Sequence, residues 1–368
     1  MDFGISKEYK KGIEITYVPG KYVKEFDGWR GVGILFVVLA HYFPKYFIGS
    51  WVFMEMFFVM SGFLITGILL DTKGKANYFK SFIFRRIFRV FPIYYLSLII
   101  FLFLLPTAWM DVTYQREHQV WFWLYIQNWL FSVEGWPAMK GLSHYWSLAI
   151  EEQFYIMWPF IVFLFSKNNL IRFCVFLFFF SLIFRNVGLN MGFVPPFQYV
   201  ATFARMEGIV LGAIIAVLVR TNKSVLERLT IPVTVIAGIG SVIVFILAKT
   251  MHMEYSLNYM INYTLVDIFF AGLIVLTLCK DRLLKLKYLF NLKVFKQLGI
   301  MSYSIYIFHL PIQIISNNLF YDYFFEMNNH VNLSKLYCVI IAFFITIPVV
   351  YIVHKLVEVP MWRVKRFF

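Results

Sequence analysis

Arg30 and His41 stand at the two ends of an apolar run, Gly-Val-Gly-Ile-Leu-Phe-Val-Val-Leu-Ala. In an α-helix, eleven residues turn the chain by about 1100°, so both side chains lie on one face, roughly 16 Å apart along the axis. An ionisable residue inside an apolar span is unfavourable and therefore usually has a function. The pattern predicts a cation at a membrane edge and an imidazole deep inside. The alternative is a purely structural histidine whose hydrogen bonds are satisfied by a neighbouring helix.

Four more ionisable residues interrupt apolar runs later in the chain, namely Glu55, Glu151, Glu152 and His309. Counting about 1.5 Å per residue from the expected helix ends places them near the middle and in the outer half of a membrane. A charge at that depth needs a partner or a water-filled cavity, so we expect one cavity shared with His41. There the neutral imidazole of His41 would act as a general base, and one of the three carboxylates would fix its tautomer. Depth alone leaves open which carboxylate does so.

A basic group is expected at the opposite, inner edge, formed by Arg30, Arg85, Arg86 and Arg89. Guanidinium groups bind phosphates through paired hydrogen bonds, which makes a phosphate clamp possible; the alternative is an ordinary topology determinant that contacts lipid. Ser302 and Tyr303 start a later apolar run at the same edge and would either bind phosphate or cap the helix. A long ligand with phosphates at one end and a reactive group near mid-membrane fits both groups of residues. Acyl-coenzyme A is such a ligand, as a co-substrate.

Membrane helices must position these residues, because 61% of the 368 residues are hydrophobic and only 15% are charged. A soluble domain could not bury so much apolar surface. The sequence predicts an all-α polytopic membrane protein with about ten transmembrane helices, each near the length that crosses a bilayer. The expected spans are 31–49, 51–70, 90–109, 146–165, 172–189, 204–220, 231–249, 263–279, 300–317 and 335–353. The tryptophan-rich run His118–Val133 is interpreted as interfacial or re-entrant.

The distribution of lysine and arginine predicts the orientation. Twenty-seven of the 34 fall in alternate connecting segments, which places both termini in the cytoplasm. The net charge of +14 is therefore topological, with some affinity for acidic lipid headgroups, and indicates no nucleic-acid partner. We predict a cytoplasmic tail over 1–29, a membrane domain over 30–354 and a second cytoplasmic tail over 355–368. Three cysteines without metal-type spacing are interpreted as packing residues, not as a disulfide framework or a metal site, and we expect no permanently bound cofactor.

Seven motifs in this order resemble the acyltransferase type-3 family of integral-membrane enzymes. They are Arg30-x10-His41, Glu55-Met-Phe-Phe-Val-Met-Ser-Gly-Phe-Leu, Arg85-Arg86-Ile-Phe-Arg89-Val-Phe-Pro92, Ser143-His-Tyr-Trp-Ser-Leu-Ala-Ile-Glu-Glu-Gln-Phe-Tyr155, Arg205-Met-Glu207-Gly208, Gly299 to His309, and Glu358-Val-Pro360. The resemblance covers about residues 24–363. It departs from the family at Glu55, where an aspartate is usual. Many members also carry an extracytoplasmic hydrolase-like domain, which the 368 residues do not include.

The resemblance implies roles for the matching positions. His41, Glu151 and Glu152 would be the catalytic residues. His41 would be the base, and the two glutamates would lie at the end of the site that takes the acceptor. Acyl-CoA would be bound by Arg30, Arg85, Arg86, Arg89, Ser302 and Tyr303. Acceptor-binding or site-lining residues would be Glu55, His144, Trp146, Ser147, Tyr155, Arg205 and His309.

The expected function is transfer of an acyl group, foremost acetyl, from acetyl-CoA to a hydroxyl of a cell-envelope glycan or its lipid-linked precursor. The expected place is a bacterial inner membrane. The transfer would be direct or would pass through an acyl-histidine. The alternative from another class is a transporter of polysaccharide precursors, since ionisable residues at mid-membrane also suit a transporter.

Overall fold

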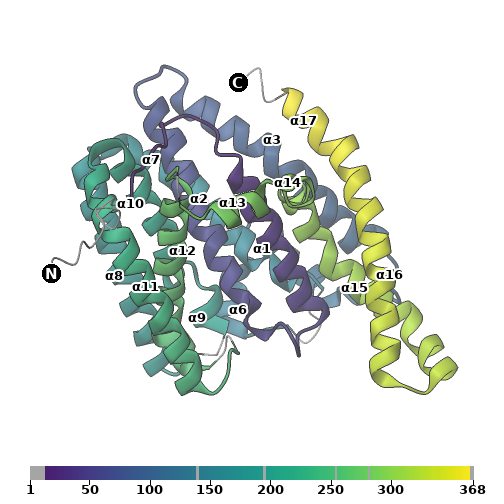
Figure 1. The fold of residues 1–368 in the computed structure, drawn as a ribbon. Coiled ribbons are helices and arrows are strands. Elements are labelled where there is room, and N and C mark those ends of the chain that lie inside the picture. Colours follow the sequence, from purple (N-terminus) through teal and green to yellow (C-terminus); the bar gives the residue numbers. More distant parts are fainter. Residues whose placement is uncertain (1–12, 138–140, 194–195, 253–254, 281, 365–368) are drawn as a thin grey trace.

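The computed structural model describes residues 13–137, 141–193, 196–252, 255–280 and 282–364. These residues form helices packed into one bundle, and the β-structure among them is a single isolated bridge between Ile15 and Cys279 (Figure 1). The predicted all-α class is confirmed. Residues 1–12 and 365–368 of the two predicted tails lie outside the described residues.

The helices follow one another in this order: α1 (Glu25–Tyr42), η2 (Ile48–Trp51), α2 (Val52–Thr72), α3 (Tyr78–Ile99), η3 (Ile100–Leu104), α4 (Thr113–Glu117), α5 (Gln119–Trp123), α6 (Gln127–Glu134), η4 (Ser143–Tyr145), α7 (Trp146–Leu164), α8 (Lys167–Asn190), α9 (Pro196–Val200), η5 (Thr202–Ala204), α10 (Glu207–Thr221), α11 (Lys223–Ala248), η6 (Asn258–Asn262), α12 (Tyr263–Thr277), α13 (Leu284–Asn291), α14 (Lys293–Ile300), α15 (Ser302–Asn328), α16 (Val331–Val353), η7 (His354–Glu358) and α17 (Val359–Val364).

Seven helical segments among the described residues are long and apolar enough to cross a membrane. They are Ile48–Thr72, Tyr78–Leu104, Ser143–Leu164, Lys167–Gly188, Lys223–Ala248, Asn258–Thr277 and Val331–Val364. An eighth results if α14 and α15, which are bent by 76° at their junction, count as one span. With this eighth span counted, two of the ten expected spans still fall outside the set. The helix α1 carries Glu25, Asp27 and Arg30, and α10 has only 15 residues.

The helix α1 begins and ends earlier than the predicted span 31–49. It starts at Glu25, where Glu25 and Asp27 occupy the first turn and suit the positive end of the helix dipole. It ends at Tyr42, just before Pro44. The helix α15 extends past the predicted limit at 317 to Asn328 and forms a hairpin with α16 (Figure 1). The predicted ends of these two spans were therefore wrong.

Glycines allow the helices around α1 and α2 to approach closely. A Cβ atom on Gly299 of α14 would overlap the carbonyl oxygen of Asp27 in α1. A Cβ on Gly62 of α2 would overlap the carbonyl oxygen of Ile209 in α10, and one on Gly212 would overlap that of Val59. These backbone contacts fix α1 and α2 relative to their neighbours, because any larger residue would force the helices apart.

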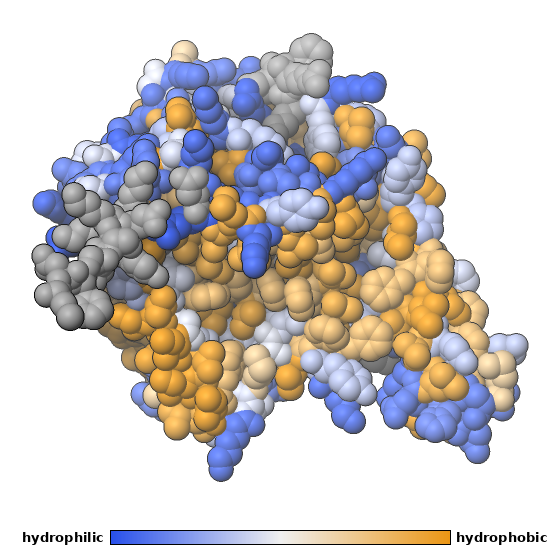
Figure 2. Space-filling view, in the orientation of Figure 1, coloured by the Kyte–Doolittle hydropathy of each residue, from blue (hydrophilic) through white to orange (hydrophobic). Residues whose placement is uncertain are grey.

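The helix ends that carry the basic segments meet on one face of the bundle. Arg220 at the end of α10 pairs with Asp71 at the end of α2 at 2.7 Å. Lys73 donates to the carbonyl oxygen of Phe165 at 2.7 Å, and Lys223 donates to that of Tyr17 at 3.0 Å. Figure 2 shows an apolar belt across the middle of the molecule, with hydrophilic residues concentrated above it. We call this hydrophilic end of the bundle the basic face.

Both predicted tails take part in the fold where they are described. Ile13 and Ile15 are buried, and the Ile15 amide donates to Glu227 at 2.9 Å. In the second tail, η7 and α17 continue the helical course of α16, and buried Glu358 accepts a hydrogen bond from Ser304 at 2.7 Å. The run 118–133 forms the short helices α5 and α6, which are not among the candidate spans.

Candidate functional site

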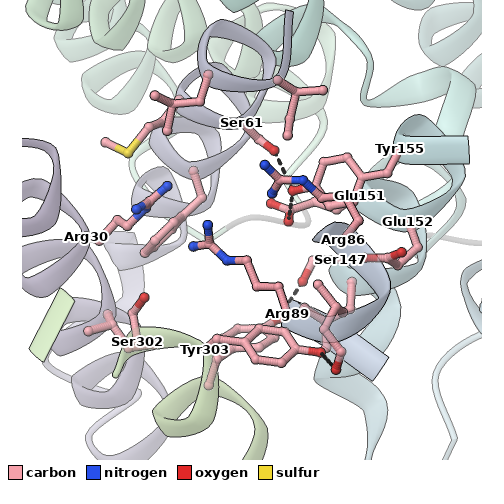
Figure 3. A pocket seen from close by; sticks show the side chains of 18 of the residues that line it. Arg30, Ser61, Arg86, Arg89, Ser147, Glu151, Glu152, Tyr155, Ser302 and Tyr303 are labelled. Atoms are coloured by element: carbon pink, nitrogen blue, oxygen red, sulfur yellow. Dashed lines mark hydrogen bonds between the residues drawn. The ribbon is translucent and has the colours of Figure 1, made fainter. Parts of the chain in front are cut away.

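A cavity of about 280 Å³ lies between α1, α2, α3, α7 and α15, toward the basic face. Its guanidinium groups are those of Arg30 from α1 and of Arg86 and Arg89 from α3 (Figure 3). We call it the arginine cavity; its other polar lining residues are Tyr22, Ser61, Ser147, Glu151, Glu152, Tyr155, Ser302, Tyr303 and Tyr306. Among the described residues, the guanidinium groups of Arg86 and Arg89 make no hydrogen bond and no ion pair. The cavity therefore presents cationic groups with unused donors.

Tyr22 lies at the mouth of the arginine cavity, because it lines the cavity and is itself 75% exposed. The Tyr22 hydroxyl donates to the carboxylate of Asp27, which in turn pairs with Arg30 at 3.6 Å. Partial burial and this carboxylate raise the pKa of Tyr22 to about 12. The hydroxyl thus stays a donor at neutral pH and holds Asp27 beside Arg30.

The wall opposite Arg30 belongs to α7. Residues Ser147, Glu151 and Tyr155 are spaced by four and lie on one face of this helix. The Tyr155 hydroxyl donates to Glu151 at 2.8 Å and is 2.7 Å from the Ser61 hydroxyl of α2. The Arg86 guanidinium lies 5.3 Å from the centre of the Tyr155 ring, within cation–π distance. Figure 3 shows this group on one side of the cavity and Arg30 on the other.

The inner end of the arginine cavity is closed by hydrogen bonds between α7 and α15. Ser147 and Tyr306 hydroxyls are 2.6 Å apart, and the Tyr306 hydroxyl donates to the carbonyl oxygen of His144 at 2.6 Å. Tyr303 donates to the carbonyl oxygen of Val90 in α3 at 3.1 Å. Beyond Tyr306, away from the basic face, lie three histidines.

The histidine cluster consists of His41 from α1, His144 from η4 and His309 from α15. Ring centroids are 4.9 Å apart for His41 and His309, 5.2 Å for His144 and His309, and 6.3 Å for His41 and His144. His309 Nε2 lies 3.0 Å from His41 Nδ1. Both nitrogens of the buried His144 ring are without a hydrogen-bond partner in the described part of the chain.

Hydrogen-bond partners assign the tautomers of the two bonded rings. His309 Nδ1 lies 2.8 Å from the carbonyl oxygen of Tyr306 and 3.0 Å from that of Ile305, so it must carry a proton. In the neutral ring, His309 Nε2 is then an acceptor, and His41 Nδ1 is the donor to it and to the carbonyl oxygen of Val37. The neutral His41 ring therefore has its basic lone pair on Nε2, the nitrogen that a general base needs.

A second cavity, of about 580 Å³, lies on the other side of His41. We call it the polar cavity; it is lined by His41, Tyr42, Pro44, Gln313, Asn317, Asn318, Tyr321, Asp322, Lys335 and Val339. The Gln313 amide donates to the carbonyl oxygen of His41 at 3.2 Å. Helix α15 thus contributes to the arginine cavity near its start, to the histidine cluster at His309, and to the polar cavity from Gln313 to Asp322.

The structure brings most predicted binding residues together, with two differences. Arg30, Arg86, Arg89, Ser302 and Tyr303 line one cavity, whereas Arg85 is exposed and is not part of that lining. Glu151 and Glu152 also line the arginine cavity, and His41 lines the polar cavity. The expectation of a single cavity shared by the carboxylates and His41 was wrong, because depth along a helix does not specify which face meets which neighbour.

Three other predicted site residues lie in or beside a buried ionic cluster and line neither cavity. Glu55 forms an ion pair with Arg205, whose guanidinium lies 4.3 Å from the Tyr263 ring centre. Trp146 packs against Tyr199, with ring centroids 4.6 Å apart. A second buried ion pair, Arg185 with Glu207, lies beside them. The Thr264 hydroxyl accepts a hydrogen bond from Arg185 and donates one to Glu207. Removal of one partner from such a pair leaves an uncompensated charge, which is strongly destabilising.

Sequence reasoning missed the polar residues of α15 beyond His309. Gln313, Asn317 and Tyr321 follow His309 at steps of four and therefore share its face of the helix. The signal was present in the sequence as a polar stripe in an otherwise apolar run. It was overlooked because none of these side chains is a usual general acid or base.

A family described as acyltransferase domain matches residues 23–355. A peptidoglycan O-acetyltransferase named OatA, from Listeria monocytogenes, is 28% identical over 316 residues, which cover 81% of this chain and 50% of that protein. The O-acetyltransferase OatA of Staphylococcus aureus is 24% identical over 333 residues, which cover 86% of this chain and 54% of that protein. The chain spans about half the length of these curated relatives. No solved structure matches it.

Proposed function

The chain belongs to the acyltransferase family that matches residues 23–355, and from this we propose that it transfers an acetyl group from acetyl-CoA to a hydroxyl of a cell-envelope glycan or its lipid-linked precursor. Two relatives bear the name O-acetyltransferase, and the name of one specifies peptidoglycan. The observation that carries the proposal is the bonded pair His41–His309, because it assigns the proton of the neutral His41 ring to Nδ1 and the lone pair to Nε2, on a residue that lines the polar cavity.

In this proposal, α1 and α10 also cross the membrane, which gives ten spans with both termini in the cytoplasm of a bacterium. The gathering of Lys73, Arg220 and Lys223 at one face supports this orientation, because positive residues are enriched on the cytoplasmic side. The charged residues of α1 lie within its first two turns, near the basic face, and are followed by an apolar stretch up to His41.

The arginine cavity binds the coenzyme, which enters from the cytoplasmic side. Its phosphates accept hydrogen bonds from the unused donors of Arg86 and Arg89 and from Arg30. Glu151 and Glu152 offset part of this positive charge and accept hydrogen bonds from amide or amino groups of the coenzyme. Arg30 and His41 are separated by roughly 16 Å along α1, a distance that the extended pantetheine arm bridges. The thioester then lies beside the histidine cluster.

The reaction begins when Nε2 of His41 takes the proton of the acceptor hydroxyl. The oxygen attacks the thioester carbonyl, a C–O bond forms, and the C–S bond then breaks. The coenzyme A thiolate leaves and takes the proton back from the imidazolium. Throughout the reaction, His309 Nε2 accepts the hydrogen bond that His41 Nδ1 donates, and so stabilises the imidazolium of His41. The unpartnered nitrogens of His144 make this ring the candidate donor to the oxyanion.

The same nitrogen would serve a two-step route. His41 Nε2 would attack the thioester, release coenzyme A and form an acetyl-imidazole, from which the acceptor hydroxyl then takes the acetyl group. Rapid acid quench of a single turnover with radiolabelled acetyl-CoA separates the routes, because only the second puts label on the protein before any acceptor is added.

The test of the function uses purified full-length protein in detergent, radiolabelled acetyl-CoA and a glycan acceptor. His41→Ala is expected to abolish transfer while the protein keeps its elution volume and its affinity for coenzyme A. The matched control is His330→Ala, which removes an exposed histidine at the α15–α16 hairpin. Transfer by His41→Ala at the wild-type rate would remove His41 from the role of base.

A further inference from the structure

The polar cavity lies where a second substrate would have to approach His41. The arginine cavity ends at Ser147 and Tyr306, and the histidine cluster separates it from the polar cavity. Within the cluster, His41 is the member that lines the polar cavity. A molecule in this cavity therefore meets the base from the side opposite the coenzyme.

The lining of the polar cavity offers both donors and acceptors. Asn317 contributes an amide, Asp322 a carboxylate and Lys335 an ammonium group. In the described part of the chain, these three side chains make no hydrogen bond and no ion pair. Tyr321 adds an aromatic ring on the same helical face as Asn317. Unused groups of this kind, beside spans that are otherwise apolar, fit a ligand with many hydroxyls.

The inner wall of the polar cavity is held rigidly. The Tyr42 hydroxyl, at the end of α1, donates to the carbonyl oxygen of His309 at 3.1 Å and lies 3.3 Å from the Thr346 hydroxyl of α16. Gln313 adds its bond to the carbonyl oxygen of His41. The end of α1 is thus tied to α15 and α16, so His41 keeps a fixed position relative to whatever occupies the cavity.

We infer that the polar cavity is the binding site of the acceptor, and that the acceptor enters it as a carbohydrate segment from the face opposite the coenzyme. This inference rests on the proposed function. Sugar hydroxyls both donate and accept hydrogen bonds, which matches the mixed set of Asn317, Asp322 and Lys335. The volume of about 580 Å³ lies in the range of small-molecule sites, roughly 300–1,000 Å³.

The first experiment measures kinetics with radiolabelled acetyl-CoA and a soluble GlcNAc–MurNAc tetrasaccharide. Asn317→Ala and Lys335→Met are each expected to raise the KM for the tetrasaccharide by about three- to tenfold, the effect of one lost hydrogen bond. The KM for acetyl-CoA should stay within about twofold of wild type. The matched control is Asn332→Ala, an exposed asparagine on the same hairpin that does not line the cavity.

The second experiment does not depend on the identity of the acceptor. Asn317→Cys and Tyr22→Cys, the latter at the mouth of the arginine cavity, are treated with a membrane-impermeant maleimide in intact cells and in inverted vesicles. The expected result is labelling of the two cysteines from opposite sides of the membrane. Labelling of both from one side would overturn the inference.

Two kinetic results for the double variant Asn317→Ala/Lys335→Met would also overturn the inference. One is an unchanged KM for the tetrasaccharide, and the other is a raised KM for acetyl-CoA instead of a raised KM for the tetrasaccharide. Neither result touches the proposed function, whose own failure is wild-type transfer by His41→Ala. The two failures are therefore distinguishable.

Discussion

Replacement of His309 by leucine tests how the histidine pair works. The buried His309 ring accepts the Nδ1–H bond of His41 at 3.0 Å, while its own Nδ1 is held by two backbone carbonyls. Leucine has a similar volume but cannot accept this bond. His41 Nδ1 would keep the carbonyl oxygen of Val37 as a partner, so its tautomer would survive. In the proposed mechanism, what is lost is stabilisation of the imidazolium that forms on His41 during the reaction.

The expected magnitude follows from the type of bond. A hydrogen bond to a charged group contributes about 1.5–3 kcal/mol. Since about 1.4 kcal/mol corresponds to a tenfold change in rate, kcat of His309→Leu should fall by roughly 10- to 150-fold. His309→Gln retains an acceptor oxygen and should recover part of this loss. His41→Ala should be slower than both.

The assay is single-turnover acetyl transfer at saturating acetyl-CoA, combined with calorimetric binding of coenzyme A in detergent. The reasoning requires that kcat falls and that the affinity for the coenzyme does not change, because His309 does not line the arginine cavity. Wild-type turnover by a folded His309→Leu protein would refute it. So would a loss that appears only in coenzyme binding.

Two further predictions concern the arginine cavity and the buried ion pair. Arg30→Ala should raise the Kd of coenzyme A about tenfold or more in calorimetry. The control Arg85→Ala changes an exposed residue outside the lining and should leave this Kd near wild type. Equal effects of the two substitutions would contradict the assignment of the cavity. Arg205→Met should destabilise the protein by about 3–5 kcal/mol, because it leaves the buried Glu55 carboxylate without its ion-pair partner. In unfolding curves measured in detergent, the double variant Glu55→Met/Arg205→Met should regain much of this stability. A double variant no more stable than Arg205→Met would argue against the ion pair as the cause.

Local spacing predicted the parts of the site that lie along single helices. The eleven-residue interval from Arg30 to His41 placed a cation and an imidazole at two heights of α1, and each lines a cavity there. The basic run of α3 likewise brought Arg86 and Arg89 to one cavity, but Arg85, which is four residues from Arg89, is exposed and lies outside the lining, so spacing alone did not separate the three arginines. Periodicity is a property of the isolated helix, so it can be read without knowledge of the fold.

Contacts between helices could not be predicted in this way. Glu55 and Arg205 are 150 residues apart, and nothing in the spacing of either one identifies the other as its partner. Counting along α7 put Glu151 and Glu152 near its start, but it could not show that they line the arginine cavity, separate from the polar cavity that His41 lines. The face that a helix turns toward its neighbours depends on packing, here on glycines such as Gly62 and Gly299 that set how closely the helices approach.

Tyr306 links the two halves of the site through two different atoms. Its hydroxyl closes the inner end of the arginine cavity by its bonds with Ser147 and the carbonyl oxygen of His144. Its own carbonyl oxygen accepts the Nδ1 proton of His309, the ring that orients His41. Ile34, which lines the arginine cavity, is seven residues and about 10 Å short of His41 along α1, so the thioester of the proposed reaction would have to pass Tyr306. In the proposed reaction, one residue would therefore border the passage of the thioester and also hold the ring that orients His41.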